Sequence, residues 1–264
     1  MNMFVTRRSL LKIGAFAAPA LIVPPKLIVP VGAPWAPFQA RAAPLVSANS
    51  FSTNFSGAPE SPISEGGVWQ HNSLLNAKLI TVGSPNRAVG TQVGGDPNDS
   101  DSYAYLNGTW RPNVSAVATI YKDPTIDTTP GEHEVELLFR VADTSTTTRG
   151  YECNYSSIGL YSNIVRWDEV GFKFLTFGSS FTPAKTGDQV KAECITSGRV
   201  NTLTSWIKYA VANGGDGVTW KKLARATDST WLEGAPGIGM WLQDASQFAN
   251  QQKYGFTTYS VTEI

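Results

Sequence analysis

The sequence predicts an all-β protein, folded as an antiparallel two-sheet β-sandwich of the jelly-roll kind. Three observations predict it. Short segments alternate apolar and polar residues, turn-forming residues separate these segments, and 264 residues with 42% hydrophobic side chains suffice for one large core. A dozen or so short strands, with no internal repeat and no break after residue 43, are typical of such a sandwich.

The expected strands follow one another along the whole mature chain. Turns such as Ser84-Pro85-Asn86 and 213–217 (Asn-Gly-Gly-Asp-Gly) separate them, and only Asp244 to Gln252 has the pattern of a short helix. In chain order the expected strands are 51–55, 79–82, 103–106, 115–121, 133–142, 151–156, 163–167, 172–177, 189–195, 200–207, 220–226, 237–242 and 255–261. In the fifth, alternation directs Val135, Leu137, Phe139 and Val141 inward and Glu134, Glu136 and Arg140 outward.

The first 42 residues have the pattern of an export signal. Arg7 and Arg8 precede an apolar stretch, Ile13–Val23, which is shorter than the roughly 20 residues of a membrane span. Ala40-Arg41-Ala42 fits a cleavage site, so the mature domain is expected at 43–264. The arginine pair resembles the bacterial twin-arginine signal, which implies a periplasmic or secreted protein with no transmembrane anchor. If cleavage fails, the Pro-rich stretch 24–44 is expected to form an extended arm against a partner.

The charge distribution argues against nucleic acid as a partner. The chain holds 21 basic and 21 acidic residues, but five of the bases and none of the acids lie in residues 1–42. The mature domain therefore carries an acidic excess of about five, which disfavours binding to polyanionic nucleic acid.

Cys153 and Cys194 are the two cysteines, and both lie in expected strands. An oxidising compartment allows one disulfide between them, and the alternative is two small buried thiols. The sequence does not give the distance between the two cysteines, so both a disulfide and two free thiols stay open.

Turns and strands follow one another in a characteristic order from residue 150 onwards. The segments are Gly150–Tyr155, Ile164–Trp167, Gly187–Glu193, Asp228–Thr230, Gly234–Gly239 and Tyr254–Val261. This order resembles the concanavalin A-like lectin/glucanase superfamily, especially its laminin-G-like exported bacterial members. The resemblance implies that strand 51–55 pairs with strand 255–261. It leaves function open, because that fold hosts lectins, hydrolases, lyases and structural modules.

Glu132, Glu134 and Glu136 alternate, so their side chains are expected on one face of a strand. Retaining glycosidases need two carboxylates about 5 Å apart. Laminarinase-like hydrolases of the resembling superfamily use a Glu-x-Asp-x-Glu strand, which implies catalysis by Glu132 and Glu136 with Glu134 between them. Here Glu134 stands in place of the Asp and His133 in place of an aliphatic residue. The alternative is a strand start whose acids face water.

Oxygen ligands crowd the loop 94–102, which offers Asp96, Asn98, Asp99 and Asp101. Such a cluster predicts a Ca²⁺ site, although the EF-hand spacing fails, and the alternative is a solvated turn. Only two histidines, His71 and His133, are present, so a Ser-His-Asp triad or a His-rich metal site is not expected.

Aromatic side chains are abundant, and flat rings flanked by polar groups are what sugar binding uses. Tyr151 and Tyr155 share a face with Cys153 and are expected inside. The remaining candidates for sugar contact are Tyr103, Tyr105, Trp110, Arg166, Trp167, Trp206 and Trp241.

We therefore expect an exported sandwich that binds a poly- or oligosaccharide by stacking and polar contacts. The alternatives are a polysaccharide-cleaving hydrolase and a structural protein of a cell surface or virion, assembled from copies or partners.

Overall fold

The computed structural model describes residues 49–71, 77–91, 101–126, 133–144, 147–169, 171–242 and 252–264. Several sequence predictions lie outside these residues: the export signal with its cleavage site, Glu132, Asp96, Asn98, Asp99, and all but the last residue of the expected helix. The elements below belong to one compact unit, Ala48–Ile264. Within the described part, no helix is both long and apolar enough to span a membrane.

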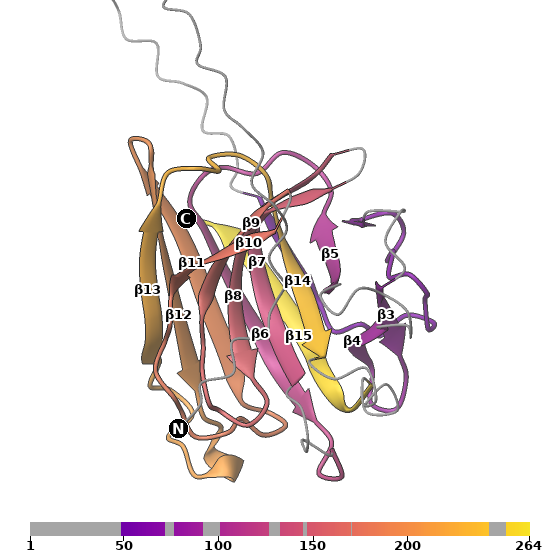
Figure 1. Cartoon of the computed structure of the whole chain (residues 1–264). Coiled ribbons are helices and arrows are strands. Elements are labelled where there is room, and N and C mark those ends of the chain that lie inside the picture. The colour runs from indigo at the N-terminus through magenta and orange to yellow at the C-terminus, as the bar shows by residue number, and fades with distance from the viewer. Residues whose placement is uncertain are drawn as a thin grey trace, which may run out of the picture. The chain divides into compact units, whose positions relative to one another are not determined.

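Two antiparallel sheets are stacked on one another (Figure 1). Sheet A contains, in spatial order, β13 (Lys221–Asp228), β12 (Val200–Lys208), β11 (Gln189–Ser197), β6 (Val114–Lys122), β15 (Tyr254–Glu263), β4 (Arg87–Thr91) and β3 (Lys78–Val82), with β1 (Ser50–Thr53) also pairing β15. Sheet B contains β10 (Phe172–Thr176), β9 (Ile164–Asp168), β8 (Thr148–Ser156), β7 (His133–Asp143), β14 (Ala235–Leu242), β5 (Ser102–Leu106) and β2 (Trp69–Gln70). A 3₁₀ turn, η1 (Val211–Asn213), lies in the loop between β12 and β13.

The predicted fold class is confirmed: the chain is an all-β, antiparallel two-sheet jelly-roll sandwich. Each of the thirteen expected strands is present to within a few residues. The expected pairing of the first and last strands is confirmed as well, because Ser50 faces Thr262 and Thr53 faces Tyr259. The sequence reading missed β4, the two-residue β2 and η1. β2 and η1 are too short to show any period.

The inner faces of the two sheets form one continuous core. Tyr151, Cys153 and Tyr155 all lie in it with no exposed surface, as their alternation on β8 predicts. Cys194 faces this core from sheet A, and both cysteines are free thiols in the structure. Burial raises the pKa of each thiol, to about 11 at Cys194, so both are protonated and unreactive at neutral pH.

Arg140 corrects the orientation expected for the second half of β7. It has a left-handed φ of 56°, and the register of β7 with both neighbouring strands shifts there. A bulge of this kind exchanges the two faces of a strand. Arg140 therefore points inward, donating to the Pro112 carbonyl and, at 2.9 Å, to Thr196 of sheet A. Val141, expected inside, packs instead with Leu138 on the outer face.

A polar clamp centred on Asp228 joins the two sheets. Tyr151 of sheet B donates its hydroxyl to Asp228 Oδ1 at 2.6 Å, and Arg166 Nη1 lies 2.9 Å from Oδ2. Arg166 also forms a bidentate pair with Asp168 of the same strand. Burial, together with the hydrogen bond to Asp228, raises the pKa of Tyr151 to about 12, so the phenol stays a donor.

Candidate functional site

The outer face of sheet B carries polar groups over its central strands. Gly239 of β14 pairs with Tyr103 on one side and Glu136 on the other. Because Gly239 has no side chain, the Glu136 carboxylate lies where a Cβ would otherwise be. Tyr103 and Trp167 cover neighbouring parts of the face, with their rings edge to face at 5.6 Å.

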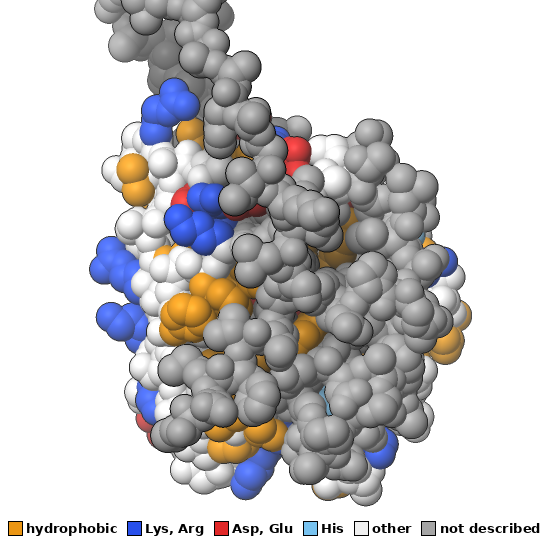
Figure 2. Space-filling view, in the orientation of Figure 1, with side chains coloured by type: hydrophobic (Ala, Val, Ile, Leu, Met, Phe, Trp, Pro, Cys, Tyr) orange, Lys and Arg blue, Asp and Glu red, His pale blue; other side chains and the backbone are white. Residues whose placement is uncertain are grey.

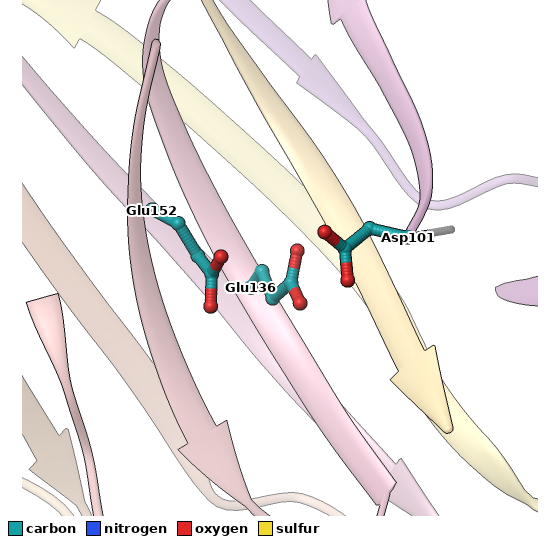
Figure 3. Close-up of side chains that lie close together, drawn as sticks. All are labelled: Asp101, Glu136 and Glu152. Carbon is teal, nitrogen blue, oxygen red and sulfur yellow. The ribbon is translucent and has the colours of Figure 1, made fainter. Parts of the chain in front are cut away.

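Three carboxylates converge on this face, those of Asp101, Glu136 and Glu152. Their oxygens lie within 4.8 Å of one another. Figure 3 shows Glu136 of β7 in the middle, with Glu152 of β8 on one side and Asp101, which precedes β5, on the other. Trp167 Nε1 and Asn154 Nδ2 each donate to Glu152 at 2.8 Å.

Two of the predicted catalytic residues, Glu134 and Glu136, lie in different surroundings. Glu134 accepts a hydrogen bond from Tyr161 and lies outside the cluster, and Glu136 is grouped with Glu152 and Asp101 instead. The alternative, that the acids face water, is wrong for both, because Glu134 and Glu136 are 1% and 0% exposed. The carboxylates of Glu136 and Glu152 are as close together as a retaining glycosidase requires.

Asp101 is the one member of the predicted calcium loop that the structure describes. It joins a three-carboxylate cluster that could hold a divalent cation, since Ca²⁺ prefers hard oxygen ligands. A bound cation or shared protons would each reduce the repulsion among three carboxylates at this distance.

A pocket of about 550 Å³ opens at the rim of the sandwich, beside the ends of β2, β5 and β7 and the start of β14. Because β14 runs antiparallel to both β5 and β7, its start lies beside their ends. Tyr105 and Trp110, both half-buried, supply aromatic surface. Its polar lining includes Gln70, Asn107, Asp143 and Glu233.

Asp143 is held in place at the pocket wall by hydroxyl groups. Tyr103 donates to its Oδ1 at 2.6 Å and Thr148 at 2.7 Å. Burial raises the pKa of Tyr105 to about 12, and the nearby charge of Asp143 and a hydrogen bond to it add to this. Burial and the charge of Lys78 lower the pKa of His71, which Asp143 opposes, so His71 is neutral at pH 7.

The predicted sugar-contact residues lie in different parts of the structure. Tyr103, Trp167 and Trp241 are buried, which leaves Tyr105 and Trp110 as those that line the rim pocket. Trp206 lies on sheet A beneath a lysine ammonium. Arg166 belongs to the clamp on Asp228.

Sequence reasoning did not single out the polar residues of the pocket or the role of Glu152. Gln70, Asp143 and Glu233 come from three distant parts of the chain, and Glu152 comes from a strand other than that of Glu136. The sequence does show where these strands end and the turns begin. Which strand ends lie side by side depends on the strand order, which the sequence does not show.

Fold and site together define a jelly-roll β-sandwich with an aromatic, acid-lined pocket at its rim. No protein-family model and no curated protein matches the chain.

Solved structures with a similar arrangement include three sandwiches. The carbohydrate-binding module CBM66 of Bacillus subtilis is 14% identical, with 76% of this chain and 96% of that chain covered and a TM-score of 0.44. The basic winged bean lectin, solved with Tn-antigen, is 10% identical, with 82% and 98% covered and a TM-score of 0.46. The CBM2 module of the evolved Dit of Lactobacillus casei BL23 phage J-1 is 12% identical, with 83% and 98% covered and a TM-score of 0.43. The strand order and pairing of this chain, rather than these similarities, define its fold.

Proposed function

We propose that the protein binds a saccharide in the rim pocket. The observation that carries the proposal is the combination of Tyr105 and Trp110 with carboxylate and amide groups in one open pocket. Aromatic surface suits the apolar face of a sugar ring, and planar polar groups suit its hydroxyls. The volume of about 550 Å³ is that of an ordinary small-ligand site.

The binding mechanism is non-covalent. Asp143, fixed by the hydroxyls of Tyr103 and Thr148, presents acceptor oxygens in a set position and loses little entropy on binding. Gln70 and Asn107 are exposed at the pocket mouth and supply both donors and acceptors. The charge of the lining, with Asp143 and Glu233 as its acids, favours sugars without carboxylate or sulfate groups.

Replacing Trp110 by Ala is expected to weaken binding by about tenfold or more to any neutral polysaccharide that the wild-type protein binds. The reason is that the substitution removes a large aromatic contact. Affinity electrophoresis and calorimetry against a panel of soluble glycans measure this. Gln70→Ala, at an exposed position, gives a second variant with less risk to folding and is expected to weaken binding several-fold. Phe177→Ala is the control, an exposed aromatic outside the pocket lining. Wild-type protein that binds no neutral glycan contradicts the proposal.

Hydrolysis is a second candidate function, favoured by the carboxylates of Glu136 and Glu152 within 4.8 Å of each other. The same glycan panel distinguishes it: release of reducing ends by the wild type, abolished in Glu136→Gln, supports hydrolysis. Retention of intact glycan supports binding alone.

We also propose that the chain is exported, on the basis of the basic, apolar and Ala-x-Ala segments of residues 1–42. N-terminal sequencing of the protein from its native host is expected to find a start at Ala43. A mature protein that retains Met1 contradicts export by cleavage and favours the structural or assembly reading.

A further inference from the structure

A second surface, on the outer face of sheet A, has the opposite charge to the rim pocket. Lys191 of β11, Trp206 of β12 and Lys222 of β13 occupy one row across three paired strands. Arg225 faces Thr204 in the next row, and Lys208 lies beyond Trp206 along β12. We call Lys191, Lys208, Lys222 and Arg225, with Trp206 and Trp220, the basic patch. Figure 2 shows Lys and Arg side chains projecting on the side where Figure 1 places β13.

Tryptophan rings hold two of these lysines in place. The Lys191 ammonium lies 4.3 Å from the centre of the Trp206 ring and 5.5 Å from that of Trp220. The Lys208 ammonium lies 4.8 Å from the Trp220 ring. Cation–π contacts leave the positive charge in place while restricting a side chain that is otherwise highly flexible. A ligand that binds these ammonium groups therefore pays less conformational entropy than it would at free surface lysines.

Bases outnumber acids on this surface among the residues described. Two acids lie near the basic patch. Glu193 forms an ion pair with Lys191 at 3.1 Å. Asp216, close to Trp220 in sequence, accepts a hydrogen bond from the Thr219 hydroxyl. A local positive surface on a domain with an acidic excess marks a place where an anionic partner is favoured.

We propose that the basic patch binds a linear anionic polysaccharide. Lys191 and Lys222 are two strands apart, about 10 Å between backbones, so the patch presents its charges in a row along a flat face. That arrangement suits an extended polymer with repeated carboxylate or sulfate groups.

Nucleic acid is a poorer match for the same surface. Binding of single strands depends on open aromatic faces on which bases stack, and Lys191 already lies over Trp206. Duplex recognition places a helix or ribbon in a groove, which the flat face of an eight-stranded sheet does not do.

The test uses the full chain and three probes: heparin, polygalacturonate and dextran. Wild-type protein is expected to bind the two anionic polymers, more weakly as salt rises, and the double variant Lys191→Gln/Lys222→Gln is expected to lose about fivefold or more in affinity. Lys173→Gln, an exposed lysine on β10 of sheet B, is the matched control and is expected to bind as the wild type does.

Trp110→Ala, which alters the rim pocket, is expected to leave heparin binding unchanged, so the two sites are tested independently. Three results overturn the proposal. One is the absence of salt-dependent binding to either anionic polymer, and another is an equal loss of affinity in the Lys173→Gln control. The third is single-stranded DNA binding more tightly than both polysaccharides through the same lysines, which would assign the patch to nucleic acid. All substituted lysines are at least partly exposed, and a thermal melt of each variant confirms that it is folded.

Discussion

Replacing Asp228 by Ala is expected to lower the free energy of unfolding by about 3 kcal/mol. Asp228 is the centre of the clamp between the two sheets, with only 12% of its side chain exposed. Its loss leaves the Tyr151 hydroxyl, which is fully enclosed, without its 2.6 Å acceptor, and Arg166 without one of its two carboxylates. Urea unfolding followed by tryptophan fluorescence measures the change.

Asp168→Ala provides the matched comparison, because Asp168 is the other carboxylate of Arg166 but is more exposed, and among the described residues its side chain pairs with Arg166 of its own strand. We expect it to cost about 1 kcal/mol, because the pair is partly exposed and Arg166 keeps its contact with Asp228. Equal losses in the two variants would mean that the ion pair with Arg166 matters and that the link between the sheets does not.

The strands could be predicted because alternation is a local property of the chain. Tyr151, Cys153 and Tyr155 alternate with polar residues on β8, and all three lie in the core as expected. The same reasoning failed at Arg140, because one bulged residue reverses the faces of everything after it and leaves no mark in the alternation.

The sites could be predicted only in part, since they are built across strands. Tyr105 and Trp110 were among the candidates for sugar contact, but their shared pocket depends on which strand ends lie side by side. Glu136 was expected to act with a glutamate of its own strand. Its actual neighbours, Asp101 and Glu152, come from positions that are adjacent only after β5, β7, β8 and β14 have paired.

Gly239 is the residue that makes room for this acidic cluster, and substituting it is the second large effect that we expect. A Cβ at Gly239 would overlap Glu136 Oε2 and lie 3.2 Å from Cδ. Gly239→Ala is therefore expected to cost about 2 kcal/mol of unfolding free energy, because the buried carboxylate must move. Gly57→Ala is the control: a Cβ there meets nothing within 4 Å, so stability is expected to stay the same or rise slightly.

A double-mutant cycle separates this overlap from any general intolerance of β14 to a side chain. If the Glu136 carboxylate is what the new methyl group meets, Gly239→Ala costs almost nothing once Glu136→Ala is present, and the coupling energy is about 2 kcal/mol. An equal cost in both backgrounds would place the conflict in the backbone or in the neighbouring Tyr103, which pairs with Gly239 from the other side. In the first case the position of the Glu136 carboxylate depends on the absence of a side chain at 239, and any larger residue there must displace that carboxylate.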